Sequence, residues 1–212
     1  MIKGISRNGA ILGGFTLATT MLIAITHWVT SPVIAKQVQS KALQTITEVF
    51  PANYWDNAIA QNCTVLNSPA GDEYKIYRSF LNQQPSGLVI EAVTKQGYGG
   101  NIKYLVSVID NSKIGGVRVL EHKETPGLGD KIELRISDWI HAFDNQATAA
   151  VSRPDWAVKK DGGRFDQFTG ATITPRALVN GVKDTVTFVQ ENYQAIFDLP
   201  NQCNAAKDTA ND

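Results

Sequence analysis

A long apolar stretch runs through the N-terminal part of the chain, from about Gly9 to Trp28. Between Arg7 and Lys36 the sequence has no Asp, Glu, Lys or Arg. As an α-helix this stretch would be ~30 Å long, which matches the hydrocarbon core of a bilayer. A cleaved signal peptide would have a shorter apolar region of roughly 7–15 residues and a small-x-small cleavage site, which Val33-Ile34-Ala35 fits poorly. We therefore expect a retained membrane anchor.

The pattern after the apolar stretch predicts a helix and then a sheet. Apolar residues recur every three or four positions up to Pro51, as in an amphipathic helix; they are Ala35, Val38, Ala42, Ile46 and Val49. A short helix is expected around residues 53–61. Four β-rich runs follow, punctuated by Gly and Pro, at residues 74–80, 87–94, 102–109 and 116–121. These runs indicate a meandering antiparallel sheet.

Two more helices are predicted in the C-terminal half. The first covers residues 137–143, with Ser137 as its N-cap. The last helix has Thr174 as its expected N-cap and Pro175 at its first position, and continues to about Phe197. Its apolar stripe consists of Leu178, Val179, Val182, Val186 and Val189. We therefore predict an α+β fold, with a single N-terminal transmembrane helix followed by one domain in which helices flank an antiparallel sheet.

Composition and charge limit the chemistry of this domain. The 212 residues include 20 Lys+Arg and 20 Asp+Glu, so nucleic-acid binding through bulk basic charge is excluded. The only two cysteines, Cys63 and Cys203, would suit an oxidising compartment if they were bridged, but two separate buried thiols fit the sequence equally well. The histidines are scattered at His27, His122 and His141, so we expect no metal site. The minimal motifs of hydrolases, P-loop proteins and Rossmann folds are absent from the sequence.

Three segments combine glycine with hydroxyl or charged residues at the ends of predicted elements. They are residues 97–100 (GYGG), 124–131 (ETPGLGDK) and 166–172 (DQFTGAT). The first two also have the composition of ordinary turns. The third brings the hydroxyls of Thr169 and Thr172 to the start of the last predicted helix, where unpaired N–H groups and the helix dipole favour a phosphate. Gly170 and Ala171 leave room for its close approach.

The third segment, Asp166-x-x-Thr169-Gly170-Ala171-Thr172, resembles the flavinylation motif of FMN-binding subunits in ion-pumping respiratory complexes. The GYGG turn, the ETPGLGDK loop and the single N-terminal span occur in the same order in that family, so the resemblance covers nearly the whole chain. Residues 156–163 and 165–168 are most similar to the G subunit of Rnf-type electron transport complexes. The related C subunit of the sodium-pumping NADH:quinone oxidoreductase is the nearest homologous subunit, and it is the alternative assignment to be excluded. Family motifs often have serine at the position of Thr169, and threonine keeps the hydroxyl.

The resemblance implies an electron carrier that is not an enzyme on its own. In the family, the hydroxyl at the position of Thr172 is joined to the phosphate of FMN as a phosphoester, by a separate flavin transferase that uses FAD and Mg²⁺. The flavin performs the redox chemistry, so no catalytic residue is expected. The resemblance also implies other membrane subunits as partners, a place in the inner membrane with the domain in the periplasm, and coupling of electron transfer to ion movement.

The other candidate residues are expected to hold the flavin. The full predicted set is Thr172, Thr169, Gly170, Ala171, Asp166, Glu124, Thr125, Gly127, Leu128, Gly129, Lys131 and Tyr98. Leu128 is expected to cover a ring face, with the backbone of Gly127 and Gly129 near its polar edge. Tyr98 is either a stacking partner or a core aromatic. Either Lys131 or Lys159 is expected to stabilise negative charge as the flavin is reduced, unless both are simply solvated.

The chain is thus expected to have five parts. They are a cytoplasmic N-terminus (1–8), a transmembrane helix (9–29), a helical stalk (30–50), a periplasmic FMN-binding domain (51–203) and a loose C-terminal tail (204–212). Gly9 and Gly13 form a G-x-x-x-G pair that suits contact with a partner helix, although glycine is also simply frequent in membrane helices. Two other functions stay open, namely a non-redox membrane-anchored adaptor and a reductase that binds FMN without a covalent bond.

Overall fold

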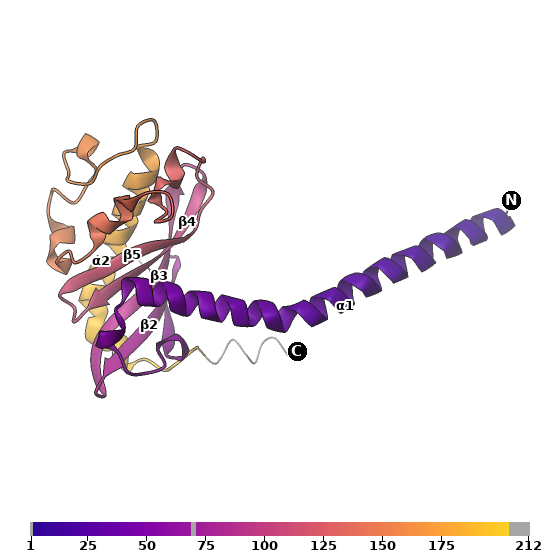
Figure 1. Ribbon diagram of the computed structural model, residues 1–212, viewed down its shortest axis with the longest axis horizontal. Helices are drawn as coiled ribbons and strands as arrows, with labels where there is room; N and C mark the ends of the chain where they lie inside the picture. Colours follow the sequence, from indigo (N-terminus) through magenta and orange to yellow (C-terminus); the bar gives the residue numbers. More distant parts are fainter. Residues whose placement is uncertain (1, 69–70, 204–212) are drawn as a thin grey trace. The chain divides into compact units, whose positions relative to one another are not determined.

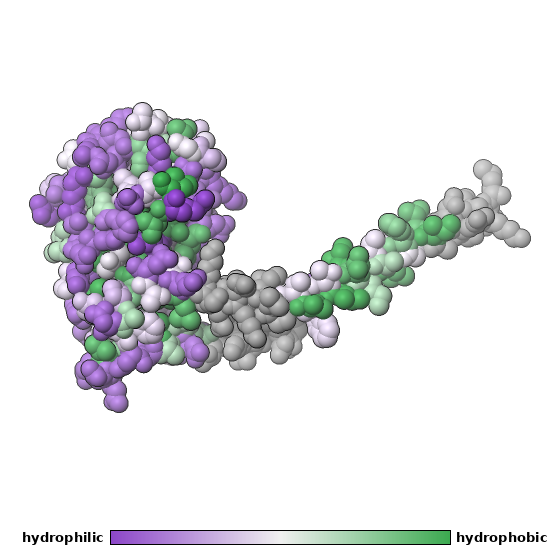
Figure 2. Space-filling model, in the orientation of Figure 1, coloured by the Kyte–Doolittle hydropathy of each residue, from purple (hydrophilic) through white to green (hydrophobic). Residues whose placement is uncertain are grey.

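The computed structural model describes residues 2–68 and 71–203, and the chain divides into two compact units, residues 1–42 and 43–212. Helix α1 (Ile2–Val49) supplies the first unit and the beginning of the second. Within it, Ile11–Ser31 is long and apolar enough to cross a membrane, and the structure buries none of this stretch. Figure 2 shows its hydrophobic side chains exposed along the helix. The helix ends just before Pro51, as the apolar pattern predicted.

The second unit is built on one antiparallel sheet of five strands, each paired with its neighbours in sequence (Figure 1). The strands are β1 (Cys63–Asn67), β2 (Glu73–Leu81), β3 (Gln84–Gly97), β4 (Gly100–Ile109) and β5 (Lys113–Glu121). The predicted meander is confirmed, and its four predicted strands are all longer than the sequence indicated. Strand β1 was not predicted at all, and it forms one edge of the sheet beside β2.

Each face of the sheet buries its own apolar cluster, because successive side chains of a strand point to opposite faces. Helix α2 (Ile173–Asp198) covers one face (Figure 1). The cluster beneath it includes Ile76, Leu88, Ile90, Val106, Leu178 and Val182. On the other face, Tyr77, Val89 and Leu105 pack in a smaller cluster with Ile46 and Val49, from the end of α1. The sheet is therefore covered on both sides, with the long C-terminal helix on one of them.

Short 3₁₀ helices occur in two connections, from α1 to β1 and from β5 to α2. They cover Ala52–Tyr54, Ile59–Gln61, Gly129–Ile132, Asp138–Phe143, Thr148–Ser152 and Lys159–Asp161. The helix predicted around residues 53–61 is wrong, because two separate single turns occupy that region. The Ser137 N-cap is confirmed, since its Oγ accepts a hydrogen bond from the backbone N–H of Trp139 at 3.3 Å, but the helix that it caps is a 3₁₀ helix.

The start of α2 differs from the prediction. Its N-cap position is Thr172, two residues earlier than Thr174. Thr174 lies inside the first turn and Pro175 follows it, at the third helical position, where a missing N–H is still tolerated because the first four N–H groups of a helix have no partner within it.

A disulfide between Cys63 and Cys203 joins the start of β1 to the segment after α2. Nearby, the backbone N–H of Gln202 donates to the carbonyl of Cys63 at 2.7 Å. The structure thus selects the bridged alternative of the two that the sequence left open. The tail expected at residues 204–212 lies outside the described residues.

Candidate functional site

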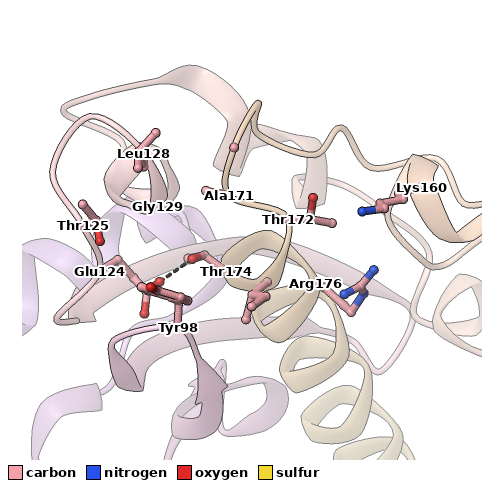
Figure 3. Close-up of a pocket in the computed structure, with 12 residues that line it drawn as sticks. Tyr98, Glu124, Thr125, Leu128, Gly129, Lys160, Ala171, Thr172, Thr174 and Arg176 are labelled. Atoms are coloured by element: carbon pink, nitrogen blue, oxygen red, sulfur yellow. Dashed lines mark hydrogen bonds between the residues drawn. The ribbon is translucent and has the colours of Figure 1, made fainter.

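A pocket of about 700 Å³ lies at the N-terminal end of α2 (Figure 3). Its volume is within the roughly 300–1,000 Å³ that is typical of small-molecule sites. The residues that line it are Tyr98, Glu124, Thr125, Leu128, Gly129, Lys160, Gly170, Ala171, Thr172, Ile173, Thr174 and Arg176. All three glycine-containing segments singled out in the sequence contribute to it, although residues 101–123 and 132–165 separate them along the chain.

The first segment is the tight turn between β3 and β4. Gly97 pairs with Gly100, whose φ of +106° is accessible to glycine without strain. At Gly99 an added Cβ would lie 1.9 Å from the carbonyl oxygen of Lys123, so this turn packs directly on the loop after β5. Tyr98, at the tip, is 71% exposed and is therefore not a core aromatic. Its ring is free to contact a ligand in the pocket.

The second segment follows β5 and forms a turn at Thr125-Pro126-Gly127-Leu128. The N–H of Leu128 donates to the carbonyl of Thr125 at 3.1 Å, and Gly127 has a φ of +76°. Proline followed by a glycine with positive φ is the composition of a type II turn. This geometry leaves the Leu128 side chain 41% exposed and places an apolar surface at the pocket.

The third segment is a similar turn that leads into α2. The N–H of Ala171 donates to the carbonyl of Phe168 at 3.0 Å, with Gly170 at a φ of +80° between them. The Phe168 side chain is buried and packs edge-on against Trp139, with ring centroids 5.2 Å apart. Trp139 in turn donates from its Nε1 to the carbonyl of Asp166 at 2.8 Å. Trp139 therefore anchors the start of this turn, through a ring contact with Phe168 and a hydrogen bond to Asp166.

Thr172 ends this segment as the residue at the N-cap position of α2. Its side chain makes no capping hydrogen bond, so the hydroxyl is not used by the helix. The unpaired N–H groups of the first turn and the positive end of the helix dipole lie next to it.

Two cationic side chains, Lys160 and Arg176, line the same side of the pocket as Thr172 (Figure 3). Arg176 holds Asp161 through a two-pronged ion pair, with N···O distances of 2.6 and 2.7 Å. The hydrogen bonds from Arg176 keep the pKa of Asp161 below its usual value. This end of the pocket is suited to an anion, because it combines a helix N-terminus with the Lys160 ammonium and with the Arg176 guanidinium, whose charge is shared with Asp161.

Four predicted site residues do not line the pocket. Asp166 forms an ion pair with Lys159 at 2.5 Å on the surface, so Lys159 is engaged away from the pocket as well. Thr169 is exposed at the tip of its turn, and Gly127 and Lys131 shape the second loop without reaching the lining. The remaining eight predicted residues are brought together.

Four lining residues were not predicted from the sequence: Lys160, Ile173, Thr174 and Arg176. Thr174 was expected only as the N-cap of the last helix. Arg176 had a signal in the sequence, because a residue four positions after Thr172 lies one helical turn above it on the same face. Lys160 had none, since the fold of residues 153–165 is needed to bring it there.

Comparison with known proteins identifies the class to which this fold and pocket belong. Residues 97–187 match the family model of the FMN-binding domain, and residues 1–49 match the RnfG N-terminal region. The chain is 45% identical over 206 residues to the G subunit of an ion-translocating oxidoreductase complex of Vibrio cholerae, covering 96% of this chain and 99% of the relative. The corresponding subunit of Pseudoalteromonas atlantica is 45% identical over 203 residues, covering 94% of each chain.

Among solved structures, the crystal structure of Shewanella oneidensis NqrC matches with a TM-score of 0.42 and 21% identity, covering 73% of each chain. The two family matches make the protein an FMN-binding domain protein, with an N-terminal helix that is a candidate membrane span. It belongs to the family of G subunits of ion-translocating oxidoreductase complexes. The resemblance on which the sequence analysis relied is confirmed.

The residues of the pocket fit FMN. Thr172, Lys160, Arg176 and the N-terminus of α2 form one polar end, suited to a phosphate. The exposed side chains of Tyr98 and Leu128 lie on the opposite side, with Thr125 and Glu124, and offer apolar surface to a flat aromatic ring (Figure 3). A ligand with a phosphate at one end and a large aromatic ring at the other matches this division.

Proposed function

We propose that this chain carries FMN joined as a phosphoester to Thr172, and that it relays electrons within an ion-translocating oxidoreductase complex of the inner membrane. The observation that carries this proposal is the position of Thr172 in the pocket at the N-terminus of α2, beside Lys160 and Arg176. Its hydroxyl makes no capping hydrogen bond to the helix. The FMN-binding domain match covers this segment. Membership in the family of G subunits supports partnership with the other subunits of such a complex.

Attachment requires a reaction at the Thr172 hydroxyl, performed by a flavin transferase with FAD as the donor. The Thr172 Oγ forms the new bond to the flavin-side phosphorus, the pyrophosphate bond of FAD breaks, AMP leaves and the hydroxyl proton is released. No redox change accompanies this transfer. The flavin, when bound, supplies the ability to accept and donate electrons singly or in pairs.

The residues of the chain hold the group and tune its surroundings. The N–H groups of the first turn of α2, with Lys160 and Arg176, stabilise the negative charge of the phosphoester. Tyr98 and Leu128 shield the ring from water, and Ile173, which is 46% exposed, extends the same apolar surface. Since the lining supplies fixed dipoles and apolar contacts, its role is to set the potential and position of the flavin.

The placement of the domain in the periplasm belongs to the same proposal. The candidate span Ile11–Ser31 supports a single-pass anchor. The Cys63–Cys203 disulfide supports an oxidising compartment for the domain that contains it, because such bonds are rare in the cytosol.

The test is the fluorescence of the denatured full-length chain after expression with a flavin transferase. Wild-type protein should keep flavin fluorescence on a denaturing gel, and Thr172→Ala should lose it. Thr187→Ala is the matched control, since it removes a threonine hydroxyl of the same helix, outside the pocket lining, and should keep the fluorescence. A chain that is coloured when native but dark after denaturation would favour noncovalent binding, and a colourless one would favour the adaptor.

A further inference from the structure

The Glu124 side chain lies beneath the pocket and connects elements from all parts of it. It is 5% exposed. Its Oε1 accepts a hydrogen bond from the backbone N–H of Gly99 at 2.9 Å. Its Oε2 accepts a second hydrogen bond from the hydroxyl of Thr174, drawn as the dashed line in Figure 3. One carboxylate therefore joins the β3–β4 turn, the loop after β5 and the first turn of α2.

The glycines around Glu124 are explained by this arrangement. A Cβ at Gly97 would lie 2.7 Å from Glu124 Oε1. A Cβ at Gly129 would lie 2.7 Å from Thr174 Oγ1 and 2.9 Å from Glu124 Cβ. These distances are shorter than van der Waals contact, so a larger residue at either position would clash with the Glu124 side chain or its partner; at Gly97 it would also meet the carbonyl oxygen of Gly100 at 2.4 Å. Two of the three glycine-containing segments thus have a glycine where the Glu124 side chain passes.

The backbone at Glu124 is held as well. Its N–H donates to Nδ1 of His122 at 3.0 Å, and Nε2 of His122 lies 2.6 Å from Oε1 of Glu133. Because Nδ1 accepts a hydrogen bond, the ring proton is on Nε2 and is donated to Glu133. The loop after β5 is therefore fixed before it turns at Thr125, and the direction of the Glu124 side chain is set by neighbouring contacts.

We propose that Glu124 is the positioning residue of the flavin site, acting through Gly99 and Thr174 to hold Tyr98 and the start of α2 at a fixed separation from Leu128. This inference rests on the proposed function, because it assigns the held pocket to FMN. Sequence analysis expected Glu124 to contact the flavin directly. Each of its oxygens accepts one hydrogen bond from the protein, and Glu124 also lines the pocket, so the direct contact stays a prediction beside the effect that we assign to it through the Tyr98 turn and the first turn of α2.

The hydrogen-bonding pattern predicts which substitutions keep the connection. Glutamine at position 124 can accept from the Gly99 N–H through its oxygen and donate from its amide to the Thr174 hydroxyl, which is also an acceptor. Alanine can do neither. Thr174→Ser keeps the hydroxyl, whereas Thr174→Val keeps the shape and removes it. Thr185→Val is a matched control, since Thr185 is a buried threonine of the same helix whose hydroxyl bonds Tyr104 at 2.9 Å, away from the pocket.

The first measurement is quenching of the flavin fluorescence by acrylamide, a neutral quencher, in the flavinylated full-length chain. We expect the quenching constant to rise at least threefold in Glu124→Ala and Thr174→Val. It should stay within about 1.5-fold of wild type in Glu124→Gln, Thr174→Ser and Thr185→Val. The inference is overturned if Glu124→Ala leaves the constant unchanged, if Glu124→Gln behaves as Glu124→Ala does, or if Thr185→Val raises it as much as Thr174→Val.

A second measurement does not depend on the flavin. Hydrogen exchange of the Gly99 amide is followed by NMR in the full-length Thr172→Ala chain, which carries no flavin under the proposed function. Adding Glu124→Ala should speed exchange at Gly99 at least tenfold, and adding Glu124→Gln should restore the slow rate. An unchanged rate in the alanine variant would overturn the role of Glu124 whatever the state of Thr172, while loss of flavin from wild-type protein would overturn only the proposed function.

Discussion

Reduction of the Cys63–Cys203 disulfide is expected to destabilise the sheet-containing unit strongly without changing its fold. The two cysteines are 140 residues apart in sequence, so the bond restricts most of the unfolded domain. Hydrogen bonds that do not involve the sulfur atoms also hold the two segments together: the N–H of Cys63 donates to Oδ1 of Asn201 at 3.1 Å, and the N–H of Val65 donates to Oε1 of Gln202 at 2.6 Å. Reduction should therefore act mainly on the unfolded chain.

The magnitude follows from the size of the closed loop. The chain-entropy model gives about 5 kcal/mol for a loop of this length at 25 °C. Domains of this kind have a free energy of unfolding of about 5–15 kcal/mol, so the bond accounts for a large share of it. With a urea dependence of about 2 kcal/mol per M, the unfolding midpoint should fall by roughly 2.5 M.

The assay is urea unfolding of the full-length chain in detergent, followed by near-ultraviolet circular dichroism with and without a phosphine reductant. A double variant, Cys63→Ala with Cys203→Ala, is the control and should unfold at the same urea concentration in both conditions. A midpoint that moves by less than about 0.5 M on reduction of the wild-type protein would refute the reasoning, because it would correspond to only about 1 kcal/mol.

Two further predictions concern packing and pH. Gly99→Ala should destabilise the domain by about 1–3 kcal/mol, because the new Cβ would meet the Lys123 carbonyl at 1.9 Å; Gly14→Ala, with nothing within 4 Å, should leave the melting temperature of the domain unchanged. Burial, with a smaller contribution from the neighbouring Glu91 carboxylate, raises the pKa of Tyr77 to about 12. An unfolded tyrosine has a pKa of about 10, so between about pH 10 and 12 the unfolded chain loses this proton while the folded chain keeps it. The free energy of unfolding should therefore fall as the pH rises through this range. Urea unfolding at each pH, alongside tyrosinate absorbance, measures the effect.

The sequence predicted the parts of the fold that depend on local patterns. Four strands of the meander and the long C-terminal helix have clear apolar periodicity and are bounded by Gly or Pro. Strand β1 has only five residues, Cys63–Asn67. It pairs with β2, and its first residues also form hydrogen bonds with Asn201 and Gln202. Its pairing with β2 joins residues 6–14 positions apart, whereas Cys63 and Val65 also donate to side chains almost 140 positions away, which no local window contains.

The candidate site likewise has residues that a local sequence pattern predicts and residues that only the folded chain brings together. Thr172, Leu128 and Tyr98 could be found because their segments have a recognisable composition and order. The use of Glu124 could not, because its partners Gly99 and Thr174 are 25 and 50 residues away and become neighbours only in the folded domain. Lys160 lies on the single 3₁₀ turn Lys159–Asp161, in a connection between β5 and α2 that has no periodic apolar pattern.

The most direct test of the account is peptide mass spectrometry of the full-length chain exported from a host that contains the flavin transferase and modifies a known target. The account predicts the mass of FMN, less water, on the peptide that contains Thr172, with fragment ions that place it on Thr172 and not on Thr169. An unmodified Thr172 peptide in that host would contradict the central claim, and the pocket at the start of α2 would then need a different ligand.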